Sequence, residues 1–180
     1  MVFYDIIKTK SLKEEKMLIK IMENMNVDAI FITDLYNLRY FTGFTGTTGV
    51  ALATKEGNFF FSDFRYKEQA TKQVEANGFK FVEVGRNSLD KVKEKLDEFG
   101  IKKLGFEDLN VTFSYYKKLE ELFKVNMNPL GESLVKQRLI KKEHEIENIK
   151  KAIEISDAAF SETLKIIKVG ITEKEIAAHL

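Results

Sequence analysis

The spacing of apolar residues up to Pro129 switches repeatedly between the helical and the strand pattern. Short apolar runs rich in β-branched and aromatic residues predict strands at 28–33, 48–54, 58–62, 79–84 and 103–107, with a further short strand at 124–127. Helical periodicity predicts helices at 11–25, near 64–76, at 88–98 and at 112–122. Ser11 and Glu14 stand at capping-box spacing at the start of the first helix, and Thr112 can cap the last.

The alternation of strands and helices predicts an α/β domain in which helices cover one β-sheet. Lys55-Glu56-Gly57 separates the runs at 48–54 and 58–62 and predicts a hairpin turn there. A hairpin joins antiparallel strands, whereas a helical crossover joins parallel ones. We therefore expect a mixed sheet rather than a purely parallel one.

The strongest boundary signal is Pro129, the only proline, followed closely by Gly131. Beyond it, residues 142–168 form one long helical pattern. Its apolar stripe consists of Ile146, Ile149, Ile153, Phe160, Leu164 and Ile167. The sequence therefore predicts one domain over residues 1–131 and a second segment over residues 132–180.

The end of the chain carries an incomplete element. Gly170 ends the long helical pattern, and Thr172 starts another helix with Glu175 at capping-box spacing. That helix is cut at Leu180. We expect the natural protein to continue beyond this point.

The charge balance and the lack of cysteine exclude several classes of function. Lys and Arg number 29 and Asp and Glu 28, so the formal net charge of +1 gives no basic excess of the kind that binds nucleic acid. Without cysteine there is no disulfide, thiolate metal site or Cys nucleophile. The start lacks a sustained apolar segment with a cleavage site, and runs such as Ala29–Ile32 are too short to cross a bilayer. We expect a cytoplasmic protein that binds neither nucleic acid nor membranes.

No motif of a complete catalytic centre occurs. The two histidines, His144 and His179, lie on separate helical segments without HExxH spacing, and we interpret both as surface or packing residues. There is no Gly-x-Ser-x-Gly elbow. The Gly-rich run 43–49 lacks the Gly-Lys-[Ser/Thr] ending of a phosphate-binding loop and precedes a strand rather than a helix. A connection between strands, with glycines for close approach of a neighbour, explains this run better.

A segment from Asn37 to Gly46, which we expect to be a loop, combines Arg39 with Tyr40, Phe41 and Phe44. Arginine and aromatic side chains on a loop are typical of interfaces and ligand contacts. The same aromatic residues can equally pack in the core. The residues alone favour neither interpretation.

A second mixed segment, Asp63-Phe64-Arg65-Tyr66, directly follows a predicted strand. Asp63 can cap the next helix, and Arg65 can pair with a nearby carboxylate. Such local roles favour a structural function for this segment over a catalytic one.

Four groups of residues stand in a distinctive order and spacing along the chain. They are Asp28–Ile32 with Asn37–Gly46; Ser62–Tyr66 with Gln69 and Ala70; Leu104–Glu107 with Tyr115–Leu119; and Arg138–Lys141 with Glu145, Ile146, Lys151 and Ala152. Together they resemble the creatinase/prolidase N-terminal domain family, and Gly170–Glu173 with Glu175–Ala177 continues the resemblance. The family resemblance implies a mixed sheet with a ribonuclease H-like fold, followed by the first helices of a "pita-bread" domain.

The resemblance implies a two-domain hydrolase, an Xaa-Pro dipeptidase or aminopeptidase P. The C-terminal domain of such enzymes holds two divalent metal ions (manganese, cobalt or zinc) through two Asp, one His and two Glu, and the metals activate water for attack on the bond before proline. All five ligands are expected downstream of this chain. We therefore assign no catalytic or metal-binding residue here and expect the chain alone to be inactive.

In this family the N-terminal domain is linked to homodimer formation and to shaping the active-site entrance for proline-containing peptides. The resemblance places our candidates for the substrate rim or dimer interface at Asn37, Arg39, Tyr40, Phe41, Phe44, Asp63, Arg65 and Tyr66. By resemblance, the loop after Tyr40 and Phe41 approaches the partner's site, and Arg39 and Phe44 are the best candidates among these residues.

Two alternatives share the architecture. The first is a non-catalytic module that binds peptides or proteins, as in histone-chaperone subunits. The second is a creatinase-like amidinohydrolase, which differs mainly in the downstream pocket. The sequence beyond Leu180 would separate them.

Overall fold

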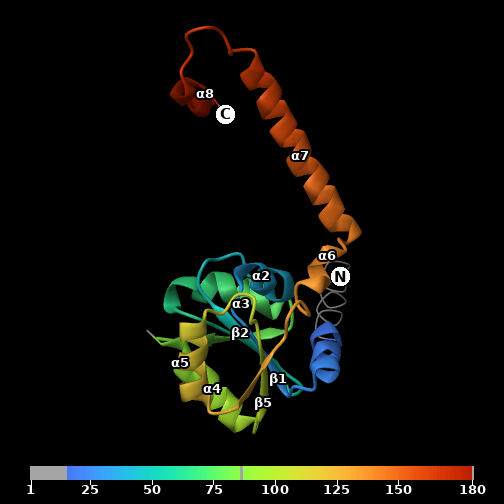
Figure 1. Ribbon diagram of the computed structural model, residues 1–180, viewed down its shortest axis with the longest axis vertical. Coiled ribbons are helices and arrows are strands. Elements are labelled where there is room, and N and C mark those ends of the chain that lie inside the picture. The colour runs from blue at the N-terminus through green and yellow to red at the C-terminus, as the bar shows by residue number, and fades with distance from the viewer. Residues whose placement is uncertain (1–15, 86, 180) are drawn as a thin grey trace. The chain divides into compact units, whose positions relative to one another are not determined.

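The computed structural model of the chain describes residues 16–85 and 87–179. Its centre is a six-stranded sheet of β1 (Ala29–Ile32), β2 (Val50–Thr54), β3 (Asn58–Ser62), β4 (Phe79–Glu83), β5 (Lys103–Phe106) and β6 (Asn126–Pro129), in the order β4-β3-β2-β1-β5-β6. The pairs β1–β2 and β2–β3 are antiparallel, and the other three are parallel. The predicted mixed α/β sheet, with helices around it, is thus confirmed (Figure 1). The hairpin turn lies where expected, between Thr54 and Asn58.

All strands except β2 run in the same direction, so their carboxyl ends lie at one edge of the sheet. The segments that follow β1, β3, β4 and β5 meet at this edge, together with the loop that precedes β2. We call it the carboxyl edge. Ligand sites of open α/β sheets form outside such edges.

Helices cover both faces of the sheet. Residues 16–25, α2 (Leu35–Thr42) and α3 (Lys67–Glu75) pack on one face, and α4 (Ser88–Glu98) and α5 (Phe113–Phe123) pack on the other. Alternate residues of a strand point to opposite faces, so β1 contributes Ile30 and Ile32 to the first core and Ala29 and Phe31 to the second. The start of the helix predicted at 11–25, with its Ser11–Glu14 capping box, lies outside the described residues.

Local capping explains where several helices begin. The Asp34 carboxylate accepts a hydrogen bond from the backbone N–H of Asn37 (2.9 Å), and the Thr112 hydroxyl accepts one from Tyr115 (3.3 Å). Such bonds satisfy N–H groups that have no partner within the helix. The predicted cap at Thr112 is confirmed. At the other end of α2, Gly43 adopts φ = 74°, a left-handed conformation that glycine adopts at little steric cost.

Three elements differ from the prediction. The segment 37–46 is not all loop, because α2 occupies Leu35–Thr42. A short helix, α6 (Lys136–Leu139), was not expected, and β6 lies at Asn126–Pro129 rather than 124–127. Proline fits the end of β6 because β6 is an outermost strand, paired on one side only.

Contacts divide the chain into two compact units, unit 1 (Met1–Arg138) and unit 2 (Leu139–Leu180). The division falls after Arg138, inside the segment that follows the predicted boundary at residue 131. Unit 2 contains α7 (Glu143–Leu164) and α8 (Glu173–His179). The capping box predicted at Thr172 is present, since the Glu175 carboxylate accepts from the Thr172 backbone N–H at 2.8 Å. Within the described residues, no helix is long and apolar enough to cross a membrane.

The apolar stripe predicted on the long helix is solvent-exposed in unit 2. Its members Ile146, Ile149, Ile153, Phe160, Leu164 and Ile167 are between 42% and 59% exposed. Contiguous apolar surface of this kind favours association. The stripe is therefore a surface that another polypeptide segment can cover.

We expect the 180-residue chain to self-associate with increasing concentration, because pairing buries this stripe. Static light scattering should show a rising weight-average mass. The double substitution of Ile149→Glu and Ile153→Glu should suppress the rise, whereas Glu154→Gln on the same helix should not. A monomer at all concentrations would contradict the expectation.

Candidate functional site

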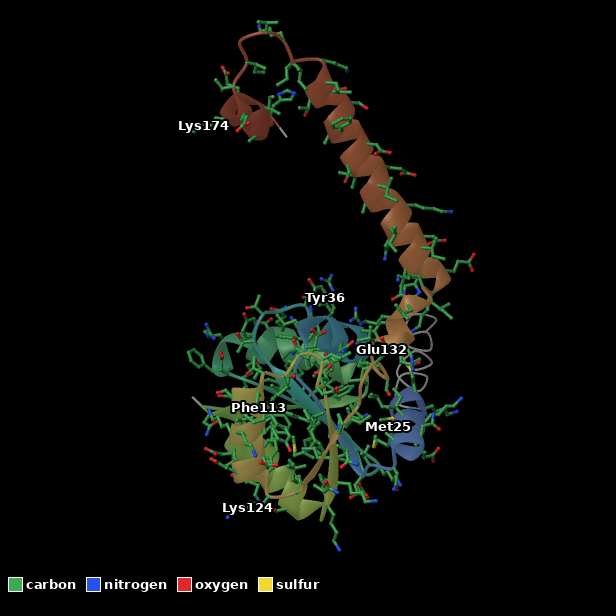
Figure 2. All side chains as sticks on the ribbon, in the orientation of Figure 1. Met25, Tyr36, Phe113, Lys124, Glu132 and Lys174 are labelled. Atoms are coloured by element: carbon green, nitrogen blue, oxygen red, sulfur yellow. The ribbon has the colours of Figure 1, made fainter. Side chains whose placement is uncertain are left out.

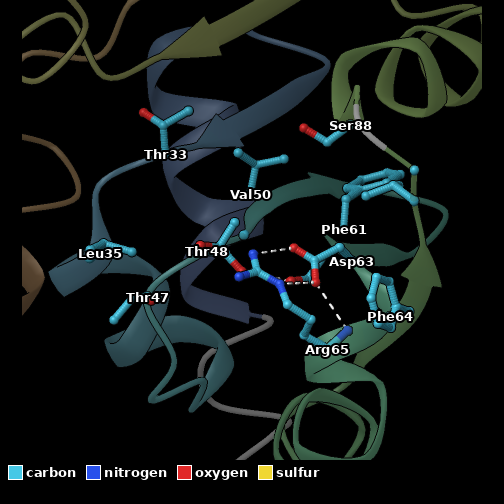
Figure 3. Close-up of a pocket in the computed structure, with 14 residues that line it drawn as sticks. Thr33, Leu35, Thr47, Thr48, Val50, Phe61, Asp63, Phe64, Arg65 and Ser88 are labelled. Atoms are coloured by element: carbon cyan, nitrogen blue, oxygen red, sulfur yellow. Dashed lines mark hydrogen bonds and ion pairs between the residues drawn. The ribbon is translucent and has the colours of Figure 1, made fainter.

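A cleft of about 780 Å³ lies at the carboxyl edge of unit 1. It is lined by Thr33 and Leu35 after β1, by Thr47, Thr48, Gly49 and Val50 at the entry to β2, by Phe61, Ser62, Asp63, Phe64 and Arg65 at the end of β3, and by Val84, Gly85 and Ser88 after β4. Figure 3 shows these side chains around the cleft. The lining combines hydroxyl groups with apolar walls and a single ion pair, a combination suited to a ligand with both polar and apolar parts.

The charged part of the cleft is the pair Asp63–Arg65. The Arg65 guanidinium donates to both Asp63 oxygens, through Nε at 2.9 Å and Nη2 at 2.8 Å, and the Arg65 backbone N–H donates to Oδ1 at 3.0 Å (Figure 3). These hydrogen bonds from Arg65 hold the pKa of the Asp63 carboxyl below its ordinary value. Because the two charges neutralise each other, the cleft has no net charge from this pair.

The loop that enters β2 is tied to its neighbours by side-chain hydrogen bonds. Gln73 accepts from the backbone N–H of Thr45 at 3.0 Å, and the hydroxyls of Thr47 and Tyr66 are 2.8 Å apart. The Ser62 hydroxyl donates to the carbonyl of Thr48 at 2.6 Å. The loop therefore presents Thr47 and Thr48 to the cleft in a fixed conformation.

Glycines in this loop allow aromatic rings to approach the backbone. A Cβ on Gly49 would lie 2.3 Å from Cζ of Phe60, and one on Gly46 would lie 2.3 Å from Cζ of Phe44. Any larger residue would displace one of these buried rings. The Gly-rich run thus serves close packing, as its composition predicted.

A buried carboxylate, Glu107, binds the turn after β1 that contributes Thr33 to the cleft. Glu107, only 5% exposed, accepts hydrogen bonds from the backbone N–H of Asp34 (2.8 Å), from the backbone N–H and hydroxyl of Thr33, and from Nδ2 of Asn37 (2.7 Å). Oδ1 of Asn37 in turn accepts from Nε of Arg138 at 2.7 Å. The network joins the ends of β1 and β5 to α2 and α6.

Exposed apolar side chains surround the carboxyl edge. Leu35, Tyr36, Phe64, Leu109 and Phe113 are between 46% and 76% exposed, and each follows the carboxyl end of β1, β3 or β5. We call these five residues the apolar rim; Figure 2 labels Tyr36 and Phe113. Exposed apolar residues that follow strands ending at one edge of a sheet are candidates for an interaction surface.

Comparison with known proteins places this domain in a family. The model of the creatinase/prolidase N-terminal domain matches residues 16–140. The chain belongs to this family. The uncharacterized peptidase YqhT of Bacillus subtilis (strain 168) is 38% identical over 157 residues, which cover 87% of this chain and 44% of that protein.

Solved structures agree with this assignment of the family. The Xaa-Pro dipeptidase from Bacillus anthracis is similar with a TM-score of 0.86 and 36% identity, over 94% of this chain and 47% of that one. The X-Pro aminopeptidase from Thermotoga maritima MSB8 gives a TM-score of 0.78 and 32% identity, over 89% and 47%. The chain spans about half the length of each of these three relatives.

Three of the predicted site residues are buried in this creatinase/prolidase-type domain. Phe41 and Phe44 are 0% and 1% exposed and belong to the core, and Asn37 is 3% exposed. Their side chains offer almost no surface to a substrate or a partner. The core interpretation of these aromatic residues therefore holds for Phe41 and Phe44, and Phe44 is not carried forward as a rim residue.

The other candidates remain accessible. Arg39 is exposed on α2, and Tyr40 is half-buried with its hydroxyl donating to the carbonyl of Gln137 at 2.9 Å. Asp63 and Arg65 line the cleft, while Tyr66 holds the loop beside it. The structure thus gathers Asp63, Arg65 and Tyr66 at the carboxyl edge.

Glu107 and Arg138 were not among the sequence-predicted site residues. Their only sequence signal was membership in the third and fourth resemblance motifs, and a role for either depends on partners far away in the sequence. An apolar strand that ends in a carboxylate, as Phe106 and Glu107 do, can indicate a group buried at the edge of a sheet.

The residues described here do not fit a dinuclear metal centre. Within residues 16–85 and 87–179, no three His, Asp or Glu side chains gather closely enough to hold a metal ion. His144 and His179 lie exposed on α7 and α8.

Removing the guanidinium of Arg65 should raise the pKa of Asp63 toward its ordinary value. Because the pKa of Asp63 is lower in the folded than in the unfolded state, its ionised form stabilises the fold at pH values above the unfolded-state pKa. This stabilisation is lost as the pH falls through the folded-state pKa of Asp63. Carboxyl titration by NMR should show the rise in Arg65→Met. Lys67→Met, which breaks the nearby ion pair with Glu83 instead, should leave Asp63 unchanged. An unaltered Asp63 midpoint in Arg65→Met would refute this assignment.

Proposed function

We propose that this chain forms the non-catalytic N-terminal domain of a dinuclear metal-dependent peptidase that cleaves the bond before proline. The observation that carries the proposal is the family match, together with 36% identity to a solved Xaa-Pro dipeptidase of which the chain spans 47%. The metal centre would lie in the remainder of the polypeptide. The chain itself offers a cleft and an apolar rim rather than catalytic groups.

The carboxyl edge is the part of the domain that we assign to the active-site entrance. Its cleft combines hydroxyl groups, which can bind the amide groups of a peptide, with the apolar side chains of Leu35, Val50 and Phe64. The internal neutralisation of Asp63 by Arg65 leaves no net charge that would favour a charged ligand. A short peptide with an apolar residue such as proline matches this lining.

The apolar rim supports a role in subunit contact. Aromatic and large aliphatic residues are enriched in the buried centres of interfaces. A homodimer that covers Tyr36, Phe64 and Phe113 would place the cleft beside the neighbouring subunit. The half-exposed stripe of α7 would be covered by the rest of the same polypeptide, as the first helix of the catalytic domain.

A binding module without catalysis is the second candidate, because the described residues contain a cleft and no catalytic constellation. The two candidates predict different sequences beyond Leu180. The series of two Asp, one His and two Glu downstream supports the peptidase, and its absence supports the module.

The test uses the polypeptide that the gene encodes, including any part beyond Leu180. The peptidase proposal predicts hydrolysis of Xaa-Pro dipeptides or longer Xaa-Pro peptides, abolished by EDTA and restored by Mn²⁺, Co²⁺ or Zn²⁺. A matched Xaa-Ala peptide should be cleaved much more slowly. A protein that binds proline-containing peptides without cleaving them under any of these conditions would favour the module instead.

A further inference from the structure

Three segments far apart in the sequence meet through one asparagine side chain. Asn37 in α2 donates through Nδ2 to Oε1 of Glu107, at 2.7 Å, and accepts through Oδ1 from Nε of Arg138, also at 2.7 Å. Asn37 is 3% exposed and Glu107 5% exposed. In a buried network each donor must face an acceptor, because a buried polar group without a partner costs free energy of folding.

The polarity of this network is fixed at both ends. The Arg138 guanidinium can only donate, so the Asn37 oxygen must face it and the Asn37 amide nitrogen must face Glu107. Oε2 of Glu107 meanwhile accepts from the backbone N–H groups of Thr33 and Asp34. The order of donors and acceptors therefore runs without a break from Arg138 to the turn after β1.

The two ends of the network have distinct positions in the fold. Thr33 lines the cleft, and Arg138 is the last residue of unit 1. A second tether joins the same two helices, because the Tyr40 hydroxyl donates to the carbonyl of Gln137. The Arg138 guanidinium also lies 5.7 Å from the centre of the Tyr36 ring, a distance typical of a cation–π contact.

We propose that Asn37 is a hydrogen-bond relay: through the two hydrogen bonds of its side chain, Arg138, the last residue of unit 1, positions the turn at Thr33 and Asp34. This turn forms a wall of the cleft. Arg138 is thus a positioning residue, and a change at either end of the relay alters the other end. The proposal concerns unit 1 alone, so its failure or success is independent of whether the protein is a peptidase.

The first test is hydrogen exchange of assigned backbone amides in the 180-residue chain. Arg138→Met keeps the length of the side chain but removes its donors. The relay predicts exchange about tenfold faster at Thr33 and Asp34, whose backbone N–H groups donate to Glu107, since one part-buried hydrogen bond of the network is lost. Lys136→Met, which breaks only the exposed pair with Glu132 on the same helix, should leave these amides unchanged. Unchanged exchange at Thr33 and Asp34 in Arg138→Met would overturn the proposal.

The second test reverses the polarity. Asn37→Asp alone places its new carboxylate opposite the carboxylate of Glu107. Glu107→Gln alone places its new amide NH₂ group opposite that of Asn37. If the Asn37 amide turns over to avoid this, its NH₂ group faces the Arg138 guanidinium instead. In the double variant, the new amide at position 107 donates to the new carboxylate at position 37, and that carboxylate accepts from Arg138. The amide oxygen at position 107 still accepts from Thr33 and Asp34. Every donor again meets an acceptor.

The relay predicts that the double variant protects the amides of Thr33, Asp34, Gln137 and Arg138 better than either single variant does. If Asn37→Asp does not fold, the comparison of Glu107→Gln with the double variant carries the test, and the double variant should again be the better protected. Purely additive losses in the double variant, or a double variant that is less protected than Glu107→Gln, would show that no relay exists.

Discussion

Replacing Glu107 with alanine should lower the free energy of unfolding of unit 1 by about 3 kcal/mol. The substitution leaves the Asn37 amide and the backbone N–H groups of Thr33 and Asp34 without their acceptor. A buried donor that loses its partner costs about 1–3 kcal/mol, and water entering the vacated space would recover part of the total. Chemical denaturation followed by circular dichroism measures the loss.

The matched control for this experiment is Glu132→Ala. Glu132 is an exposed carboxylate whose ion pair with Lys136 is 3.4 Å long and solvent-screened. It should change the free energy of unfolding by no more than about 0.5 kcal/mol. Equal effects of the two substitutions would mean that Glu107 contributes no more than a surface charge.

Phe60→Ala should be at least as destabilising, by about 3–5 kcal/mol. Phe60 is fully buried in β3, and its ring centre lies 4.5 Å from that of Phe44. Truncation removes a large apolar contact and leaves a cavity beside Gly49, whose backbone packs against the ring. The loss of support should also speed hydrogen exchange in the loop 43–49, which carries Thr47 and Thr48 at the cleft.

Phe64→Ala is the control for the aromatic core, because Phe64 is 73% exposed. Its removal should alter the free energy of unfolding by about 0.5 kcal/mol or less. Should Phe60→Ala prove as mild as Phe64→Ala, the core on the α2–α3 face would not depend on this ring.

Much of the fold could be predicted because most elements have strong local patterns. The strand at 58–62 and the helix at 88–98 lie where the sequence placed them, since continuous apolar residues or a clear helical stripe define each one. The hairpin between β2 and β3 followed from Lys55-Glu56-Gly57. These features depend on residues that are neighbours in the sequence, so the sequence alone is enough to predict them.

Helix α2 was missed because its residues have mixed propensities. Leu35 and Tyr36 are exposed, while Asn37, Leu38 and Phe41 are buried against the sheet, so the helix is stabilised by tertiary packing. Capping signals were nevertheless present in the sequence, with Asp34 before the helix and Gly43 after it. Read together, they would have predicted it.

The site could be predicted only in part. Asp63 and Arg65 are separated by two positions, and their pairing is local enough to expect from the sequence. The link between Glu107, Asn37 and Arg138 depends on how the chain folds back on itself, and no local pattern carries that information. The same limit explains why burial of Phe44 could not be separated from an interface role.

A hydrolysis assay of the 180-residue chain itself tests whether this domain lacks catalytic activity of its own. The chain should be incubated at high concentration with Ala-Pro and Ala-Pro-Ala in the presence of Mn²⁺, Co²⁺ or Zn²⁺. On the proposed function the metal ligands belong to the remainder of the polypeptide, so we predict no release of the residue before proline above the rate without protein. Metal-dependent cleavage by this chain alone, abolished by EDTA, would show that the domain is catalytic and would contradict the proposed function.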